Sequence, residues 1–246
     1  EGGLRTQGYF KKGGGGKPLI TVVTVVFNGE AHLEETILSV INQTYDNVEY
    51  IVIDGASADE TVDIIRKYEY AIDYWVSEKD SGIYYAMNNA LKLGAGKWIN
   101  FMNSGDKMSD LNVLSDIATI KCHSFYGGVY KKKLSFPNHQ AMYVDLIWHK
   151  KNFFKTQYKI AADYEIKILL MNLNKLEKIN RTVVKYLPGG VSESLGYGKD
   201  YLKNQFDILI INISNQRVFY GLFNFLWRAA YSFIRCALNE IRQHTI

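Results

Sequence analysis

Residues 19–27 read Leu-Ile-Thr-Val-Val-Thr-Val-Val-Phe, an apolar run without alternation that stops at the turn-forming pair Asn28-Gly29. An unbroken run of Val, Ile and Thr is typical of a strand that is covered on both faces. Residues 48–53 read Val-Glu-Tyr-Ile-Val-Ile and form a second run of this kind, which stops at Asp54-Gly55. The two runs therefore predict two buried strands.

Segments with helical periodicity separate the predicted strands. Residues 31–43 repeat apolar side chains at helical spacing. Ser57 and Glu60 have the spacing of a capping box before a second helix. Further helices are expected at residues 61–68 and 84–93, and further strands at residues 72–76 and 97–102. Because strand and helix alternate, the pattern predicts an α/β fold with a parallel sheet and right-handed crossovers.

The regular alternation fades after residue 106. Residues 124–130 and 176–187 are expected to be strands. A loop is expected at residues 138–140 and a helix at residues 161–173. The second half of the chain is therefore expected to extend the sheet without repeating the strand–helix order.

Composition excludes several classes of protein. The 246 residues are 47% apolar and 22% charged, which is typical of a globular chain. Two cysteines, Cys122 and Cys236, exclude a disulfide framework and a four-thiolate zinc site, and they fit a reducing compartment. The net charge of +4 is too small to indicate a nucleic-acid partner. Since no stretch of 18 apolar residues is present, a membrane-spanning helix is not expected.

Three of the predicted strands end in polar clusters. Asn28 follows the first strand, Asp54 the second, and Asn103-Ser104-Gly105-Asp106 the fourth. In open α/β sheets, ligands bind beyond the carboxyl ends of the strands, where such loops gather. A helix cap is the alternative interpretation of each cluster taken alone. Three clusters on one rim favour a ligand site.

Three aspartates carry the predicted chemistry. Asp106 follows a tight turn and can reach a Mg²⁺-like ion, which usually takes one or two protein carboxylates beside phosphate oxygens. Asp54 can accept hydrogen bonds from a nucleoside, and Asp163 can act as a general base toward an incoming hydroxyl. The set predicts transfer of a group from a nucleoside diphosphate donor.

Several spaced motifs closely resemble those of the family 2 glycosyltransferases. The motif at residues 39–45 reads Ser-Val-Ile-Asn-Gln-Thr-Tyr, and the motif at residues 53–61 begins Ile-Asp-Gly-Ala-Ser. The motifs occupy residues 20–28, 39–45, 53–61, 77–84, 86–88 and 103–106. The resemblance extends from residue 18 to about residue 170. Within the family, the chain is similar to the bacterial branch that builds O-antigen and capsule polysaccharide.

The resemblance implies a GT-A fold, which is Rossmann-like with a mostly parallel central sheet flanked by helices. It implies inverting transfer of a sugar from a nucleotide-diphosphate sugar, expected to be a UDP-sugar, to a hydroxyl of a glycan acceptor. The acceptor is expected on a polyprenyl-diphosphate lipid, and the cofactor is expected to be Mn²⁺ or Mg²⁺. The catalytic domain is expected at residues 18–195, after a flexible segment at residues 1–17 and before a helical region at residues 196–246.

The donor-binding positions follow from the matched motifs. Asp54 matches the aspartate that binds the nucleoside, and Asp80 and Asn88 match polar positions beside the base and the donor sugar. The other residues expected to contact the donor are Thr24, Val25, Phe27, Asn28 and Ser104. Met87 stands where many relatives carry arginine, so one diphosphate contact is expected to be absent or to come from elsewhere.

The metal motif of the family matches residues 103–106. Asn103 and Gly105 replace carboxylates, which leaves Asp106 as the one evident metal ligand. Asp163 matches the catalytic base, with Glu165 as the second candidate. His139 and Gln140 lie near the place where the acceptor pocket of the family forms, so they are expected to contact the acceptor, and a structural role for His139 is the alternative.

The last part of the chain differs in composition from the rest. Residues 217–238 combine many aromatic side chains with Arg217, Arg228 and Arg235. An aromatic, arginine-bearing amphipathic helix suits a membrane interface. The resemblance to the family, whose members typically extend a sugar on a polyprenyl-diphosphate carrier, implies a peripheral position on the cytoplasmic face of the membrane. Docking of this helix onto the domain, or onto a second subunit of a homodimer, is the alternative.

Two other functions compete with sugar transfer. A sugar nucleotidyltransferase would need a phosphate-binding glycine loop after the first strand, and residues 28–31 do not supply one. A non-catalytic scaffold would keep the fold without the chemistry, and the carboxylate-poor motif at residues 103–106 is its only support.

Overall fold

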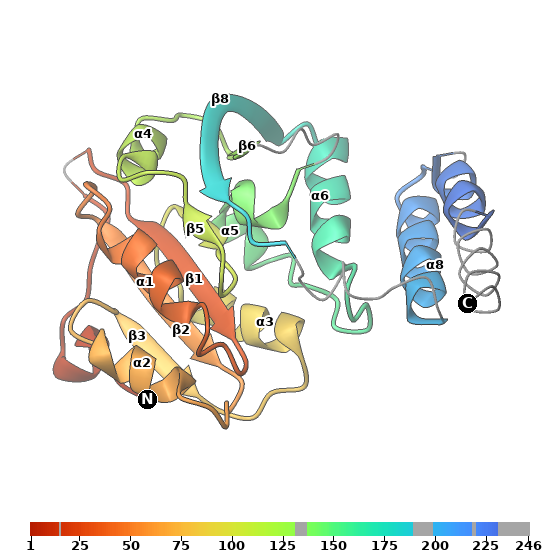
Figure 1. Cartoon of the computed structure of the whole chain (residues 1–246). Coiled ribbons are helices and arrows are strands. Elements are labelled where there is room, and N and C mark those ends of the chain that lie inside the picture. Colours follow the sequence, from red (N-terminus) through yellow and green to blue (C-terminus); the bar gives the residue numbers. More distant parts are fainter. Residues whose placement is uncertain (15, 131–136, 189–198, 218–219, 231–246) are drawn as a thin grey trace. The chain divides into compact units, whose positions relative to one another are not determined.

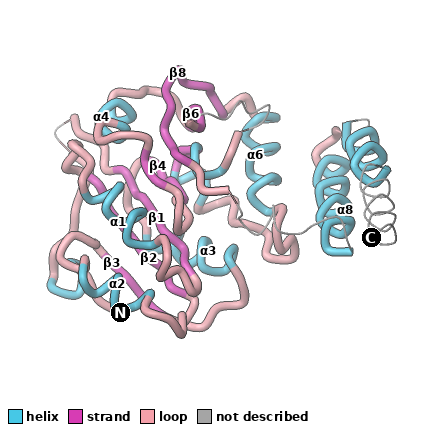
Figure 2. Tube along the Cα trace, in the orientation of Figure 1, coloured by secondary structure: helices cyan, strands magenta, loops and turns pink. Residues whose placement is uncertain are grey.

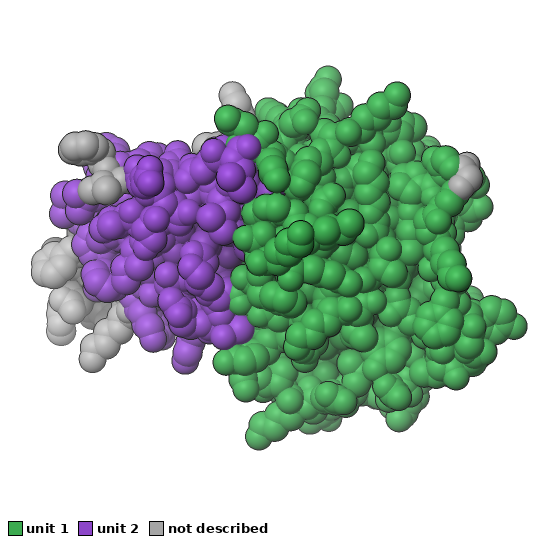
Figure 3. All heavy atoms as spheres, turned by 180° about the vertical axis from the view of Figure 1, so that it is seen from behind, with its two compact units in different colours: residues 1–154, 174–187 green, residues 155–173, 188–246 purple. Residues whose placement is uncertain are grey.

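A computed structural model describes residues 1–14, 16–130, 137–188, 199–217 and 220–230 (Figure 1). The chain forms two compact units, which Figure 3 shows in different colours. The first unit contains residues 1–154 and 174–187. The second contains residues 155–173 and the chain after residue 187. This division differs from the expected boundaries at residues 17 and 195, because the helix after residue 161 belongs with the C-terminal helices.

The first unit is built on a mixed sheet (Figure 2). Its strand order is β3-β2-β1-β4-β7-β6-β8-β5. The first four strands are parallel: β3 (Tyr74–Ser77), β2 (Val48–Asp54), β1 (Ile20–Val26) and β4 (Trp98–Phe101). This half confirms the two apolar runs as buried central strands, since all seven residues of β1 and of β2 are buried.

The other half of the sheet has strands of both directions. Its strands are β7 (Met142–Asp145), β6 (Ser124–Val129), β8 (Leu176–Lys185) and β5 (Lys107–Met108). β7 is antiparallel to β4 and β6, β6 is parallel to β8, and β8 is antiparallel to β5. The sheet is therefore parallel in most of its pairs, as expected, with antiparallel strands added after β4.

Helices cover both faces of the parallel half. They are α1 (Leu33–Ile41), α2 (Thr61–Lys67) and α3 (Ile83–Leu93), followed by the short α4 (Val113–Ala118) and α5 (Leu146–His149). Ile20, Val22 and Val26 of β1 lie in one hydrophobic core with side chains of α1 and α2. Because side chains alternate along a strand, the odd-numbered residues of β1 face the other side, where α3 contacts β1 and β2.

The segment before residue 18, which we expected to be flexible, makes specific contacts. Gly2 pairs with Trp75 of β3, and the 3₁₀ helix η1 (Leu4–Gln7) follows directly. Arg5 forms an ion pair with the buried Glu49 of β2. These contacts add a short edge to the sheet beside β3.

The expected capping box before α2 is wrong. Glu60 is the N-cap residue, but no side chain caps the helix there. Ser57 instead donates its hydroxyl to the carboxylate of Asp54 at 2.5 Å. Asp59 accepts hydrogen bonds from the backbone N–H of Thr61 at 3.1 Å and from its hydroxyl at 2.5 Å. The Ser57 hydroxyl, which we expected to cap α2, therefore donates to the buried carboxylate of Asp54 instead.

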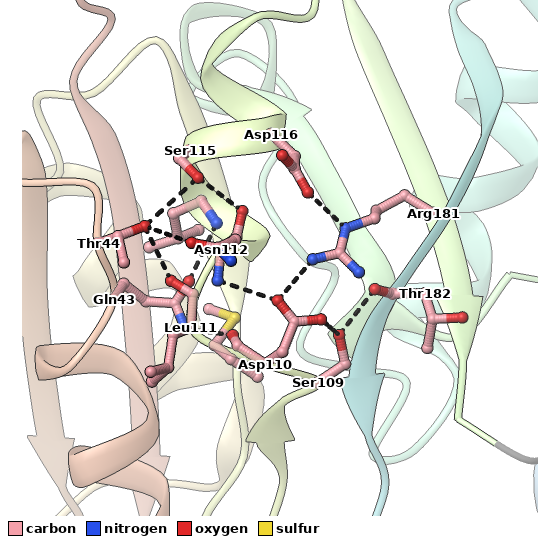
Figure 4. Close-up of polar contacts among 12 residues, drawn as sticks. Gln43, Thr44, Ser109, Asp110, Leu111, Asn112, Ser115, Asp116, Arg181 and Thr182 are labelled. Carbon is pink, nitrogen blue, oxygen red and sulfur yellow. Dashed lines mark hydrogen bonds and ion pairs between the residues drawn. The ribbon is translucent and has the colours of Figure 1, made fainter.

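A polar network ties the end of α1 to the far strands (Figure 4). Gln43 donates its side-chain N–H to the backbone carbonyl of Asp110 at 2.7 Å. The Asp110 carboxylate accepts a hydrogen bond from Arg181 of β8 at 2.6 Å. Ser109 donates to the carbonyl of Thr182 at 2.8 Å. Gln43 of the matched motif is thus structural and holds the segment that follows β5.

The second unit is helical in its described part. Its helices are α6 (Ala162–Asn172), α8 (Lys199–Ser214) and a further helix at residues 220–230. Tyr164 of α6 and Asn212 of α8 exchange hydrogen bonds at 3.1–3.2 Å. The rings of Phe206 and Phe225 lie 6.2 Å apart. None of the helices in the described ranges is both long and apolar enough to cross a membrane.

Residues 231–246, 131–136 and 189–198 lie outside the described residues. The expected amphipathic helix at residues 217–238 is therefore described only over residues 217 and 220–230. Cys236 and Arg235 lie outside the described part as well. The helical region expected after residue 195 begins, in the described chain, with α8 at Lys199.

Candidate functional site

The loops after β1 and β2 are bonded to each other. The backbone N–H of Asn28 donates to the Ser57 hydroxyl at 2.7 Å, and the Asn28 side-chain carbonyl accepts from the N–H of Ala58 at 3.0 Å. Asn28 has a φ of 49° and Ala56 a φ of 62°, so both turns use left-handed backbone. Two of the three predicted polar clusters are thus joined on one rim.

Asp54 lies at the base of this rim and is fully buried. It accepts hydrogen bonds from the Ser57 hydroxyl at 2.5 Å, the Ser57 N–H at 3.0 Å and the Ser77 hydroxyl at 2.6 Å. A carboxylate has roughly four acceptor positions, so these three donors use most of its capacity. Asp54 therefore organises the loops, and the sequence did not single out its partner Ser77.

An exposed aromatic ring and a carboxylate flank the same turn. The side chain of Phe27 is 66% exposed at the end of β1. A Cβ atom added to Gly55 would lie 3.2 Å from Asp80 Oδ2 and 3.4 Å from the Phe27 ring. Asp80 is fixed by the N–H of Gly82, which donates to it at 2.8 Å. Phe27, Gly55 and Asp80 thus form an adjacent set that fits a planar ring with polar edges.

The loop after β4 meets the loop after β1. A Cβ atom on Gly29 would lie 2.4 Å from Val26 and 2.9 Å from the Ser104 hydroxyl, so only glycine allows this approach. From the other side, the buried Thr36 of α1 accepts a hydrogen bond from the Gly105 N–H at 2.8 Å and donates to the Asp106 carbonyl at 2.8 Å. All three predicted clusters therefore converge in the first unit. No sequence pattern singled out Thr36.

Asp106 is buried, with 2% of its surface exposed. Its Oδ1 atom accepts a hydrogen bond from the N–H of Leu187, just after β8, at 2.8 Å. Gly105 has a φ of 96°, and a Cβ atom there would lie 2.5 Å from Leu187. Glycine in place of the usual carboxylate thus lets the chain after β8 pack against the loop.

Oxygen atoms beside Asp106 lack partners. Within the described part of the chain, Asn103 Oδ1 and Ser104 Oγ are buried and accept no hydrogen bond. No cluster of three or more His, Cys, Asp or Glu is found among the described residues. Mg²⁺ and Mn²⁺ bind hard oxygen atoms and tolerate few protein carboxylates when phosphate supplies the rest. The donor set of Asn103, Ser104 and Asp106 therefore fits such an ion.

The two predicted acceptor residues lie next to this loop. Both are in the 3₁₀ helix η2 (His139–Ala141). The side-chain N–H of Asn103 donates to Nε2 of His139 at 3.1 Å. Gln140 is only 4% exposed, and its backbone carbonyl accepts from Asn100 of β4 at 2.9 Å. The structure thus joins His139 to the metal motif and buries Gln140, and the expected contact of these two residues with the acceptor stays a prediction.

Thr24 and Val25 are not at the surface of the rim. Thr24 has no exposed surface, and its hydroxyl forms a 2.9 Å hydrogen bond with the Tyr50 hydroxyl. Burial raises the pKa of the Tyr50 phenol, so this pair is neutral. Val25 is 6% exposed. The side chains of Thr24 and Val25 are therefore buried on opposite faces of β1, as the unbroken apolar run predicts for a strand that is covered on both faces.

Asn88 holds backbone rather than facing the rim. Its amide donates to the carbonyl of Phe154 at 2.9 Å and accepts from the N–H of the same residue at 3.0 Å. Phe154 packs on the ring of Tyr84, 5.3 Å away, and on His149, 4.8 Å away. Burial lowers the pKa of His149 to about 4, so this cluster is uncharged at neutral pH. Asn88 thus holds the backbone at Phe154, and its expected contact with the donor sugar stays a prediction.

The two candidate bases lie in the first turn of α6, in the second unit. Asp163 forms an ion pair with Lys167 at 2.5 Å, and their side chains are 14% and 8% exposed. Glu165 forms an ion pair with Lys155 at 2.7 Å and is 4% exposed. Because Asp163 lies in a different unit from Asp54 and Asp106, its expected convergence with them stays a prediction.

The model of the family described as "Glycosyl transferase family 2" matches residues 21–168, which is more than half of the chain. The chain belongs to this family. Putative teichuronic acid biosynthesis glycosyltransferase TuaG of Bacillus subtilis is 37% identical over 95 residues, which is 37% of each chain. The match to the first curated relatives spans only 38% of their length.

Two solved structures of low sequence identity share the fold of this family 2 member. S. aureus TarS 1-349 in complex with UDP-GlcNAc superposes with a TM-score of 0.68 at 17% identity, covering 85% of this chain and 72% of TarS. Mannosyltransferase PcManGT from Pyrobaculum calidifontis, in complex with GDP-Man and Mn²⁺, gives 0.61 at 14% identity, covering 96% and 80%. The GT-A fold expected from the motifs is thereby confirmed.

Proposed function

We propose that the protein is an inverting glycosyltransferase that moves a sugar from a UDP-sugar to a hydroxyl group of a glycan acceptor. The observation that carries the proposal is the convergence of the loops after β1, β2 and β4 on one rim of the sheet. The rim joins an exposed aromatic ring, a carboxylate and a group of oxygen atoms. These features suit the base, the nucleoside and the diphosphate of one donor molecule.

The base of the donor is assigned to the surface formed by Phe27, Gly55 and Asp80. An exposed aromatic ring offers a stacking platform for a planar base, and the Asp80 carboxylate accepts an N–H from its edge. Asp54 supports this surface from below through Ser57 and Ser77. The complex of TarS with UDP-GlcNAc, which has the same fold, supports a uridine nucleotide.

The diphosphate is assigned to the loop after β4. Asp106, with the unpartnered oxygens of Asn103 and Ser104, would hold a Mn²⁺ or Mg²⁺ ion. Such an ion, when bound, neutralises charge that develops on the departing diphosphate. Support comes from the chemistry of these oxygen atoms and from the Mn²⁺ complex of PcManGT. Thr36 fixes the loop by bonding to both Gly105 and Asp106.

Asp163 is the proposed general base. Its carboxylate takes the proton of the acceptor hydroxyl while that oxygen forms a bond to the anomeric carbon and the bond to the diphosphate oxygen breaks. Attack from the face opposite the diphosphate inverts the anomeric centre. Lys167 pairs with Asp163 at 2.5 Å and holds the carboxylate in place. Glu165 is the weaker candidate because its carboxylate is only 4% exposed.

The acceptor is proposed to be a growing glycan on a polyprenyl-diphosphate lipid, reached from the cytoplasmic membrane surface. Support comes from residues 220–230, where Phe223, Leu226 and Trp227 are 64–69% exposed beside Arg228. Aromatic side chains with a cation suit the lipid headgroup region. Flotation with anionic vesicles tests this: the double variant Phe223→Ser/Trp227→Ser should bind them more weakly than the wild type. Equal flotation would refute it.

The function is tested by a panel of nucleotide sugars. Thermal shift with Mn²⁺ first selects the donor that stabilises the protein, and mass spectrometry then follows transfer to a lipid-linked or soluble glycan acceptor. We expect a UDP-sugar to stabilise the protein and to be consumed. A non-catalytic scaffold would show stabilisation without consumption, and a nucleotidyltransferase would form a nucleotide sugar from a sugar phosphate instead.

A further inference from the structure

We infer that His139 is a positioning residue for the metal motif: it orients the amide of Asn103 so that the carbonyl oxygen, and not the NH₂ group, is available to the ion. The inference rests on the proposed function, because it concerns the ion at residues 103–106. It gives His139 a role different from the acceptor contact that the motif suggested. It also explains how an asparagine can serve where the family usually has a carboxylate.

The structure places the NH₂ group of Asn103, and not its carbonyl oxygen, on the histidine. Asn103 Nδ2 lies 3.1 Å from His139 Nε2. An amide NH₂ only donates, so Nε2 accepts and the ring proton lies on Nδ1. With its NH₂ group on the histidine, Asn103 leaves Oδ1 without a partner in the described structure. The one oxygen of this side chain is therefore kept for a ligand.

The histidine is itself held in place by the strand that precedes Asn103. Asn100 of β4 donates to the carbonyl of Gln140 at 2.9 Å and to that of Met142 at 2.8 Å. The N–H of Ala141 donates to the carbonyl of Asn138 at 3.0 Å and closes the turn of η2. Asn100 and Asn103 therefore both form hydrogen bonds to the segment of η2. The position of His139 relative to Asn103 follows from backbone contacts.

The need for such a partner follows from the chemistry of an amide. A carboxylate presents an oxygen in either orientation of its plane, whereas an amide turned by half a rotation presents two N–H donors to the ion. A buried ion facing N–H donors is repelled. A histidine nitrogen that accepts a hydrogen bond selects the productive orientation. Partners behind the ligands of a metal commonly change its affinity about 10- to 100-fold when removed.

The experiment measures Mn²⁺ affinity of the full chain with UDP present, by electron paramagnetic resonance of free Mn²⁺. His139→Leu removes the acceptor and should weaken Mn²⁺ binding about 10- to 100-fold. His139→Gln should restore part of the affinity, because its amide oxygen can accept from Asn103. The double variant Asn103→Asp/His139→Leu should bind Mn²⁺ as well as the Asn103→Asp variant, since a carboxylate needs no orienting partner.

Controls separate this inference from the proposed site. His123→Leu, on a half-buried histidine before β6, should leave Mn²⁺ affinity unchanged. Asp106→Ala should abolish binding; if it does not, the proposed metal site itself is wrong. If Asp106→Ala abolishes binding but His139→Leu binds Mn²⁺ like the wild type, His139 does not position Asn103. A loss in His139→Leu that Asn103→Asp fails to suppress also overturns the inference.

Discussion

The hydroxyl of Thr36 donates to the backbone carbonyl of Asp106 at 2.8 Å, and it joins the buried face of α1 to the loop that follows β4. The same hydroxyl accepts from the N–H of Gly105 at 2.8 Å. One side chain therefore satisfies two buried backbone groups on either side of the proposed metal ligand. The position of Asp106 depends on a helix that lies far from it in the sequence.

Thr36→Val should weaken both stability and metal binding. Valine keeps the shape but leaves the Gly105 N–H and the Asp106 carbonyl without partners. Unsatisfied buried groups cost about 1–3 kcal/mol each, so urea unfolding should show a loss of about 2–6 kcal/mol for the two groups. Thr119→Val is the control, because its hydroxyl bonds only to the exposed turn at Asp116. Equal stability of the Thr36 variant and wild type would contradict the proposed bracing.

Arg5→Met should destabilise the protein strongly. The Glu49 carboxylate is 2% exposed and also accepts hydrogen bonds from Thr21 and the N–H of Ala95, but Arg5 is the cation that neutralises it. Removing one partner of a buried ion pair costs about 3–5 kcal/mol. Lys17→Met is the matched control, since its pair with Asp46 is 62% and 75% exposed and is screened by water, so its loss should leave the unfolding midpoint nearly unchanged. Similar unfolding midpoints for the two variants would be inconsistent with an anchored N-terminal segment.

The ion pair of Asp110 and Arg181 should make stability depend on pH in acid. The hydrogen bond from Arg181 lowers the pKa of Asp110 to about 2, below its ordinary value of 3.8. A carboxyl with a depressed pKa in the folded state stabilises the protein above the unfolded pKa, and this contribution is lost as the pH falls toward 2. Wild type should thus exceed Asp110→Asn at pH 6, and the difference should shrink by pH 3. Because Asp110 is 46% exposed, we expect no more than about 1 kcal/mol. A difference in urea midpoint that is independent of pH would argue against the pair.

Asp163→Asn should bind the donor normally and lose transfer. The amide cannot take the proton of the acceptor hydroxyl, and a positioned base contributes about 10²- to 10⁴-fold in rate. Glu165→Gln is the comparison and should retain most of the rate if its folding is preserved. The measurement compares kcat and the Kd for the UDP-sugar in each variant with those of the wild type. Undiminished turnover in Asp163→Asn would show that another residue is the general base.

The fold could be predicted from the sequence, whereas the roles of several site residues could not. The unbroken runs at residues 20–26 and 48–54 leave few alternatives to buried parallel strands. Which face a side chain takes, and which partner it meets, depends on contacts between distant segments. Thr24 is therefore found against Tyr50, and Asn88 against Phe154. A motif gives the position of a residue in the chain but not what its polar atoms contact.

The central claim is that a uridine nucleotide stacks on Phe27 at the rim formed by the loops after β1 and β2. The most direct measurement is the Kd for UDP with Mn²⁺, by isothermal titration calorimetry, in wild type, Phe27→Ala and Tyr70→Ala. Stacking on an aromatic ring contributes about 1–3 kcal/mol, so Phe27→Ala should weaken binding by about 5- to 150-fold. Tyr70, which is 67% exposed and bears no proposed role, should be replaceable without effect. Wild-type affinity for UDP in Phe27→Ala, or no UDP binding in the wild type, would contradict the account.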